Sequence, residues 1–367
     1  MDQDVKRIFM AWPTITNEMK EEASRVLTEE KLVLGESVFK FEEEFAKYIG
    51  VDHAISTTSG TTALILINNF LLGTNAKVMT TAHSFIATAY SILLSNNEAF
   101  FGDINPLTGN IDINRVSTDA LSNIDALLPV HLHGNMANMD EILESAEKHN
   151  FKVIEDACQA HGAMYGNRKA GSLGDAAAFS FYSTKNMTVG GDGGMITTNN
   201  DELAKKINSY RDNGRKEGEK YVHDALGATA RLNTVNAAIG RIQLRHIDSW
   251  NEERRSIANQ YDNAFKNIDQ IQVLQVTKNS LPAYHLYPIL IQNRDKFAKY
   301  MKDEKIECGL NYPIAMVDQP FFGNKYKDQN FPNSRKWASK VVCLPIHNNL
   351  SSDDIARVIE TTQKFFE

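Results

Sequence analysis

An acid, a serine and a lysine follow strand-like apolar stretches near the middle of this chain. Asp156 ends the stretch 153–156, while Ser180 and Lys185 come at the end of and just after the stretch 176–181. A desolvated lysine amine can form a Schiff base with an aldehyde, and a carboxylate can keep a pyridine nitrogen protonated. Taken alone, Lys185 fits a solvated surface lysine and Asp156 fits a helix cap. Together the three residues indicate chemistry with pyridoxal 5′-phosphate (PLP).

A second small-residue segment, 56–64, lies between a strand-like and a helix-like stretch. It contains Gly60, Thr61 and Thr62 and would place hydroxyl groups and free backbone N–H groups at a helix N-terminus, which suits a phosphate. It is not a Walker loop, because no Gly-Lys-Ser/Thr follows, and an ordinary capped helix start is the alternative. The glycine cluster 190–194 leads into a strand rather than a helix, which argues against a dinucleotide site.

Four further residues could face the same site. Gln159, three residues after Asp156, could donate a hydrogen bond to the phenolic oxygen of the cofactor, and Phe85 at the start of a helix could stack on the pyridine ring. Asp103 and His131 end predicted strands. Core packing of Phe85, turn capping by Asp103 and an internally satisfied His131 are the alternatives.

Composition narrows the class of protein. The 367 residues are 42% hydrophobic and 23% charged, with a net charge of −7, which gives no basic surface for nucleic acid. The three cysteines are few and far apart, so neither a disulfide framework nor a metal site is predicted. The longest apolar runs are too short for a bilayer, and residues 1–7 lack an apolar signal core. We therefore expect a cytoplasmic protein that binds neither membrane nor nucleic acid.

Strand-like and helix-like stretches alternate from residue 54 to residue 197, including predicted strands at 126–131 and 152–155. This alternation predicts a mostly parallel sheet with helices on both faces. A long helix is predicted from about Asn233 to Phe265, and a strand-like stretch follows at 284–291. We predict an N-terminal arm at 1–34 with one helix capped by Thr16, a large PLP-binding domain at 35–248 and a smaller α/β domain at 249–367.

Taken together, these residues resemble the DegT/DnrJ/StrS family of PLP-dependent sugar aminotransferases over nearly the whole chain. No single motif carries the resemblance, but the ordered set does. The motifs, in family order, are Phe41-Glu42, Tyr48-Ile49-Gly50-Val51, Ser59-Gly60-Thr61, Val130-His131-Leu132-His133-Gly134, Glu155-Asp156-Ala157-Cys158-Gln159, Ser180-Phe181-Tyr182-Ser183-Thr184-Lys185, Gly193-Gly194, Arg231-Leu232-Asn233, Ala237-Ala238-Ile239-Gly240, Tyr312-Pro313 and Leu344-Pro345-Ile346.

The resemblance implies a PLP-dependent transferase type I fold, like that of aspartate aminotransferase, and homodimers with shared active sites. It implies catalytic roles for Lys185, as the Schiff-base lysine, and for Asp156, as the partner of the pyridine nitrogen. The implied cofactor contacts are Gly60, Thr61, Thr62 and Ser180 at the phosphate, Phe85 at the ring, Gln159 at the phenolic oxygen and Thr229 from the neighbouring subunit. Tyr182, Asn311 and Tyr312 are the implied substrate contacts.

Three positions depart from the family pattern. Thr229 stands where asparagine commonly reaches the phosphate of the neighbouring subunit, and its shorter side chain weakens the case for that contact. Asn311 stands where histidine commonly precedes Tyr312-Pro313, and Asn213 also replaces a common histidine.

The resemblance implies an enzyme that converts a keto sugar to an amino sugar, and we expect a nucleotide-linked keto-deoxysugar as the substrate and polysaccharide biosynthesis as the purpose. L-Glutamate is the implied amino donor, and pyridoxamine 5′-phosphate is the form of the cofactor between the two half-reactions. One alternative substrate is a cyclitol ketone or another keto sugar without a nucleotide. A non-catalytic binding or regulatory relative is the alternative from another class, but such a protein would be expected to lose Lys185 or Asp156.

Overall fold

The computed structural model describes residues 6–367 and contains a central seven-stranded sheet of order β1-β9-β8-β5-β4-β2-β3. Its strands are β1 (His53–Thr57), β2 (Lys77–Thr81), β3 (Glu98–Gly102), β4 (Ala126–Leu128), β5 (Lys152–Asp156), β8 (Ala176–Ser180) and β9 (Gly194–Thr198). All strands of this sheet except β9 run in the same direction, so the sheet is mostly parallel, as predicted.

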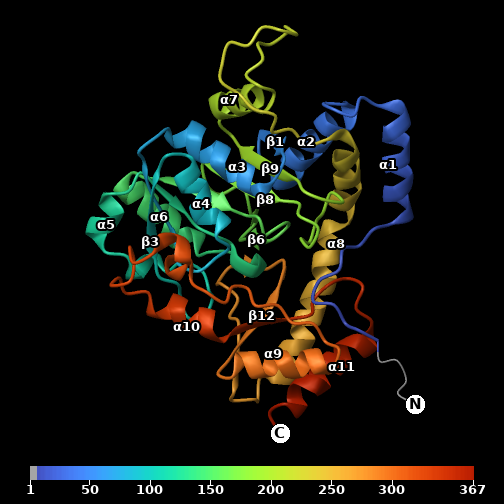
Figure 1. Cartoon of the computed structure of the whole chain (residues 1–367), viewed down its shortest axis with the longest axis vertical. Helices are drawn as coiled ribbons and strands as arrows, with labels where there is room; N and C mark the ends of the chain where they lie inside the picture. The colour runs from blue at the N-terminus through green and yellow to red at the C-terminus, as the bar shows by residue number, and fades with distance from the viewer. Residues whose placement is uncertain (1–5) are drawn as a thin grey trace.

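Both faces of this sheet are buried, because alternate residues of a strand point to opposite sides. On β5, Val153 belongs to one apolar cluster and Ile154 to the other. The first cluster includes α2 (Glu36–Ile49) and α6 (Met139–His149), and the second includes α3 (Gly60–Ile67), α4 (Ala87–Leu94) and α7 (Asp201–Arg211). The layers are visible in Figure 1, and they leave the strand ends as the accessible edges of the sheet.

The long helix α8 (Thr234–Phe265) runs from the large sheet to the C-terminal part of the chain (Figure 1). That part contains an antiparallel sheet of β10 (Ile271–Val273), β12 (Tyr287–Ile291) and β13 (Val341–Leu344), with helices α9 (Arg294–Asp303), α10 (Pro332–Lys340) and α11 (Ser352–Lys364). The predicted boundary at 248/249 lies inside α8, and the division into domains stays a prediction.

A third, small sheet joins segments on either side of that boundary, which sequence periodicity did not indicate. In it, β11 (Ser280–Leu281) pairs with β6 (Met164–Tyr165), which pairs with β7 (Arg168–Lys169). Among residues 6–367, no helix is both long and apolar enough to span a bilayer.

Some predicted element ends were wrong. The strand predicted at 126–131 ends at Leu128, because Pro129 has no N–H to donate, and a 3₁₀ turn forms at Leu132–Gly134. The strand predicted at 284–291 begins only at Tyr287. Helix α4 begins at Ala87, so Phe85 precedes the helix rather than starting it.

The N-terminal arm contains helix α1 (Asn17–Glu29), which packs on α8. Thr16 caps it by accepting a hydrogen bond from the backbone N–H of Met19, as the sequence predicted. Met19 and Val26 are buried against the rest of the protein, whereas Leu27, one residue after Val26, is exposed.

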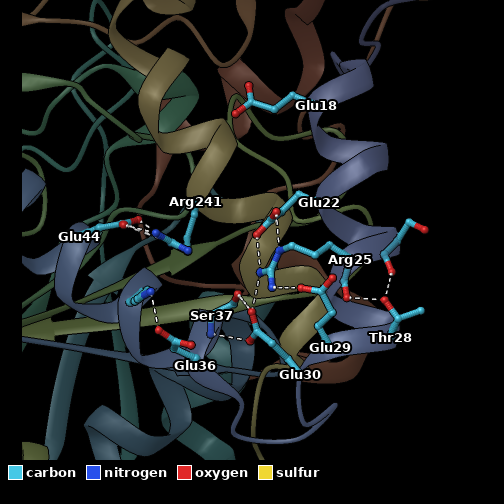
Figure 2. A network of polar contacts seen from close by, with 12 residues as sticks. Glu18, Glu22, Arg25, Thr28, Glu29, Glu30, Glu36, Ser37, Glu44 and Arg241 are labelled. Carbon is cyan, nitrogen blue, oxygen red and sulfur yellow. Dashed lines mark hydrogen bonds and ion pairs between the residues drawn. The ribbon is translucent and has the colours of Figure 1, made fainter.

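A cluster of charged side chains joins α1 to the start of α2 (Figure 2). Arg25 contacts Glu22 at 2.7 Å, Glu30 at 2.6 Å and Glu29 at 3.4 Å. Glu30 in turn accepts hydrogen bonds from the backbone N–H of Ser37 at 2.9 Å and from its hydroxyl at 2.8 Å. Glu30 thus satisfies a free N–H at the N-terminus of α2 and complements the dipole of that helix.

We expect Glu30→Gln to lower the free energy of unfolding by about 1–3 kcal/mol, because charge-assisted hydrogen bonds are lost around a nearly buried group. Burial alone would raise the pKa of Glu30, but hydrogen bonds from Ser37 and Arg25 outweigh it and hold the pKa below its ordinary value. The contribution is therefore present above the unfolded-state pKa of about 4.3 and is lost as the pH falls through the folded-state pKa.

Urea unfolding of both proteins at several pH values measures this difference. Glu29→Gln is the matched control, because Glu29 contacts the same arginine while largely exposed, and it should change the free energy by less than about 0.5 kcal/mol. Equal effects of the two substitutions would contradict the assignment.

Candidate active site

A cavity of about 490 Å³ lies beyond the carboxyl ends of β5 and β8, where ligands bind in sheets of this kind. Nearly all predicted site residues line it: Gly60, Thr61, Phe85, Asp156, Gln159, Ser180, Tyr182, Lys185, Asn311 and Tyr312. Thr62 and Thr229 do not. The hydroxyl of Thr62 instead contacts those of Thr58 and Ser59 at the start of α3.

Lys185 reaches the cavity from the turn that follows β8. Its backbone N–H donates to the carbonyl of Tyr182 at 2.8 Å, which closes the turn. Burial lowers the pKa of Lys185 from its ordinary value, and the charge of nearby Asp156 offsets only part of this effect. A lysine in this state carries a neutral, nucleophilic amine at a lower pH than a surface lysine does.

Asp156, the last residue of β5, is buried and has both carboxylate oxygens engaged. Oδ2 accepts a hydrogen bond from the hydroxyl of Thr88 at 2.8 Å, and Oδ1 accepts from the backbone N–H of Cys158 at 3.2 Å. Sequence reasoning missed Thr88, which lies on α4 three residues after Phe85 and is buried. The signal available in the sequence was the spacing, because a residue one helical turn after a predicted ring contact can face the same site.

The N-terminus of α3 closes one end of the cavity. The backbone N–H groups of Gly60 and Thr61, the first two residues of the helix, have no possible partner within it. A Cβ atom on Gly60 would lie 2.7 Å from Sγ of Cys158 and 2.8 Å from Cβ of Ser180. Only glycine therefore allows this helix to come so close to β8, and the resulting cradle suits a phosphate.

Aromatic side chains also border the cavity. The rings of Phe85 and Tyr312 lie 5.7 Å apart, and the side chains of Phe85 and Tyr182 are about half exposed. Gln159 was predicted to contact the cofactor. Its Nε2 donates to the Tyr312 hydroxyl at 3.2 Å, while its Oε1 accepts from the backbone N–H of His133 at 2.8 Å.

A histidine that the sequence did not single out also lines the cavity. Nδ1 of His285 lies 3.3 Å from Oδ1 of Asn186, the residue after Lys185. The amide nitrogen of Asn186 already donates to Asn251 and Ala283, so its oxygen is the acceptor and His285 carries its hydrogen on Nδ1. Burial lowers the pKa of His285 well below its ordinary value, so the ring is neutral.

Asp103 and His131 do not line the cavity. The carboxylate of Asp103 accepts hydrogen bonds from the backbone N–H groups of Asn333 and Ser334 at the start of α10. His131 lies 2.9 Å from Glu155 in the core, with its other ring nitrogen accepting from Ala137. Asp103 therefore caps a backbone segment and His131 is an internally satisfied core residue, which were the alternatives to a role in the site.

Two of the departures from the family pattern contact each other. The hydroxyl of Thr229 donates to Oδ1 of Asn213 at 3.2 Å, within the segment that follows α7. This segment projects from the rest of the chain beyond α7 (Figure 1). Thr229 does not line the cavity of its own chain, and a contact with a second copy stays a prediction.

These residues fit PLP. The amine of Lys185 with its lowered pKa, the buried carboxylate of Asp156 and the N-terminus of α3 border one cavity at the edge of the mostly parallel sheet. The class that fold and site define is that of PLP-dependent aminotransferases with the aspartate-aminotransferase-like fold. The chain belongs to the DegT/DnrJ/EryC1/StrS aminotransferase family, whose pattern it matches over residues 13–363.

Comparison with individual proteins agrees with this membership. The chain is 36% identical to a pleiotropic regulatory protein of Geobacillus stearothermophilus, with 95% of each chain covered. It is 34% identical to the dTDP-3-amino-3,6-dideoxy-alpha-D-galactopyranose transaminase of Aneurinibacillus thermoaerophilus, over 99% of this chain and 98% of the relative. The crystal structure of S. venezuelae DesV with a ketimine intermediate superposes with a TM-score of 0.90 at 31% identity, covering 95% of this chain and 94% of DesV. The protein is a PLP-dependent sugar aminotransferase.

We expect Thr88→Val to lower the rate of transamination roughly tenfold, because Asp156 loses a buried hydrogen-bond donor and its orientation. Thr88→Ser keeps the hydroxyl and is the matched control, with a rate within about threefold of the wild-type rate. Steady-state kinetics with saturating PLP measure both variants. A Val variant as fast as the Ser variant would rule out a role for this hydrogen bond.

Proposed function

We propose that this enzyme transfers the amino group of L-glutamate to a nucleotide-linked keto sugar, with Lys185 and Asp156 as its catalytic residues. The observation that carries the proposal is the single cavity that joins an amine of lowered pKa, Lys185, to a buried carboxylate held by Thr88. The family membership and the sugar transaminases among its relatives support the substrate class.

In this proposal each residue acts on a stated atom. Bound PLP would supply an electron sink for the carbanion that forms at the amino-acid carbon. Asp156 would hold the pyridine nitrogen protonated, since an opposite charge within hydrogen-bond reach stabilises the charged form. The Nζ atom of Lys185 would take the proton from the amino-acid carbon and would then give it to the carbon of the cofactor that receives the amino group.

The phosphate would lie at the N-terminus of α3, against Gly60, Thr61 and Ser180, where free N–H groups and hydroxyls meet the positive end of the helix dipole. Phe85 would cover the ring, and Tyr182 and Asn311 would contact the sugar. Glycine at position 60 allows the helix to approach β8 closely enough for one phosphate to contact both.

Charge at the cavity supports a homodimer with shared active sites. Lys185 is the only cationic side chain among the residues that line the cavity in the described chain. A dicarboxylate donor and a nucleotide diphosphate both require further positive charge. The projecting segment after α7 carries Arg215, Lys216 and Lys220, but also Glu217, Glu219 and Asp224, so it offers individual cations and no net positive charge. Tyr221 in this segment is 81% exposed, and we propose that the segment reaches the site of a second copy together with Thr229. A cytoplasmic location also stays a prediction.

A cyclitol ketone is the second candidate substrate, because the same cavity chemistry would serve it. The G. stearothermophilus relative is named a regulatory protein, so a non-catalytic role is the alternative to an enzyme. The presence of both Lys185 and Asp156 at the cavity favours the enzyme.

The first half-reaction tests the proposal directly. On addition of L-glutamate to the PLP-loaded protein, we expect the absorbance of the cofactor to change to that of pyridoxamine 5′-phosphate, with release of 2-oxoglutarate. Lys185→Ala should retain the fold by circular dichroism and show no such change. An unchanged wild-type spectrum would remove L-glutamate as donor, and turnover by the Lys185→Ala variant would refute the catalytic assignment.

Shared active sites are tested by mixing two inactive variants. Lys185→Ala and a chain shortened by residues 216–224 should each be inactive as pure dimers. After unfolding and refolding together, hybrid dimers should recover up to about a quarter of the wild-type activity, because one of the two sites is intact in half of the dimers. No recovery, with hybrids confirmed by mass, would argue for sites built from one chain.

A further inference from the structure

Two buried histidines hold the backbone of residues 311 and 312 at the wall of the cavity. His83 follows β2, and its Nε2 lies 3.0 Å from the carbonyl oxygen of Tyr312. His133 lies in the turn after β4, and its Nε2 lies 2.9 Å from the carbonyl oxygen of Asn311. A carbonyl oxygen can only accept, so both histidines carry hydrogen on Nε2 and donate it. We call His83 and His133 the histidine clamp.

The surroundings keep both rings neutral and fixed. His83 and His133 are buried, and neither Nδ1 atom has a hydrogen-bond partner among residues 6–367. Burial lowers the pKa of His83 to about 4 and that of His133 to about 3. The indole ring of Trp337 lies edge-on to His83 at 5.9 Å and stacks on His133 at 6.2 Å. The clamp therefore presents two stationary N–H donors to the segment that carries Tyr312.

A third contact fixes the Tyr312 side chain. Its hydroxyl oxygen accepts a hydrogen bond from Nε2 of Gln159. Burial raises the pKa of Tyr312 well above its ordinary value, so the phenol keeps its own hydrogen. No described residue accepts this hydrogen in a hydrogen bond, although the side chain of Asn311 lies beside the hydroxyl, and Tyr312 lines the cavity. The hydroxyl is thus a fixed donor available to a molecule bound there.

A carboxylate is the ligand group that this donor suits. Lys185 is the only cation that lines the cavity in the described chain, so the contacts that this chain itself makes to a carboxylate include neutral donors. Hydrogen bonds to charged groups are stronger than those between neutral groups. A donor held in place before binding also loses little conformational freedom when the ligand arrives.

We propose that His83 and His133 are positioning residues, which fix Asn311 and Tyr312 so that the Tyr312 hydroxyl donates to a carboxylate of the amino-acid donor. This inference rests on the proposed function, because it takes L-glutamate as that donor. The histidines act through the backbone of residues 311 and 312 and need not touch the ligand.

The test compares His83→Met and His133→Met, which remove the donor, with His83→Gln and His133→Gln, which place an amide N–H near the former Nε2. We expect each Met variant to raise the L-glutamate concentration at half-maximal rate of the first half-reaction roughly tenfold, with a smaller change in the limiting rate. The Gln variants should stay within about threefold of wild type. His347→Met is the control, because His347 is buried and lies 3.1 Å from the carbonyl of Phe9, away from the cavity.

A second readout does not depend on activity. A single 3-fluorotyrosine at position 312 gives one ¹⁹F resonance in the cofactor-free protein, which the Met variants should shift or broaden and the Gln and His347→Met variants should preserve. In a Tyr312→Phe background, the Met substitutions should no longer change the half-saturating L-glutamate concentration, since their effect passes through the lost hydroxyl.

Either of two results would overturn the proposal: Met variants with wild-type resonance and half-saturation, or additive effects in the Tyr312→Phe background. Should the Met variants fail to fold, Tyr312→Phe alone decides, because wild-type half-saturation in that variant excludes the proposed donor. A wild-type protein that does not react with L-glutamate refutes the donor and the carboxylate contact, whereas the fluorine resonance still reports on the clamp.

Discussion

The close approach of helix α3 to the carboxyl end of β8 and the amino end of β9 is the constraint on which the site depends. A Cβ atom on Gly60 would collide with Cys158 and Ser180, and one on Gly194 would lie 2.4 Å from the backbone of Ser59. With glycine at both positions, the first turn of the helix reaches the strand ends. Free N–H groups of the helix, the Ser180 hydroxyl and the carboxylate at the end of β5 then border one cavity.

Electrostatics in that cavity follow from burial. Low polarity disfavours the charged form of every group, and the outcome for each group depends on its partners. Asp156 accepts two hydrogen bonds, whereas the Lys185 amine has no hydrogen-bond partner among the described residues and burial lowers its pKa. A hydrogen-bonded carboxylate and an amine of lowered pKa within one cavity are the arrangement that a protonated pyridine ring and a reactive aldehyde require.

The C-terminal part of the chain completes the cavity through contacts that cross the molecule. Helix α8 connects the two parts, and the small sheet of β6, β7 and β11 joins them a second time. The histidine clamp and Gln159 add polar contacts to residues 311 and 312 from the large sheet. The position of Tyr312 therefore depends on both parts of the chain at once.

The sequence by itself determined the alternating sheet, the long helix from Asn233, the cap at Thr16 and most of the residues that line the cavity. These features are local, because apolar periodicity, capping residues and short motifs can each be recognised within a short stretch of sequence. Strand ends were less certain, since Pro129 ended β4 three residues before the predicted end.

Only the tertiary structure decided the partners of these residues. Thr88 beside Asp156, His285 beside Asn186, and the two histidines that hold residues 311 and 312 join positions 68 to 229 residues apart. Such contacts arise from strand order and helix packing, and a local pattern of residue types contains no information on either.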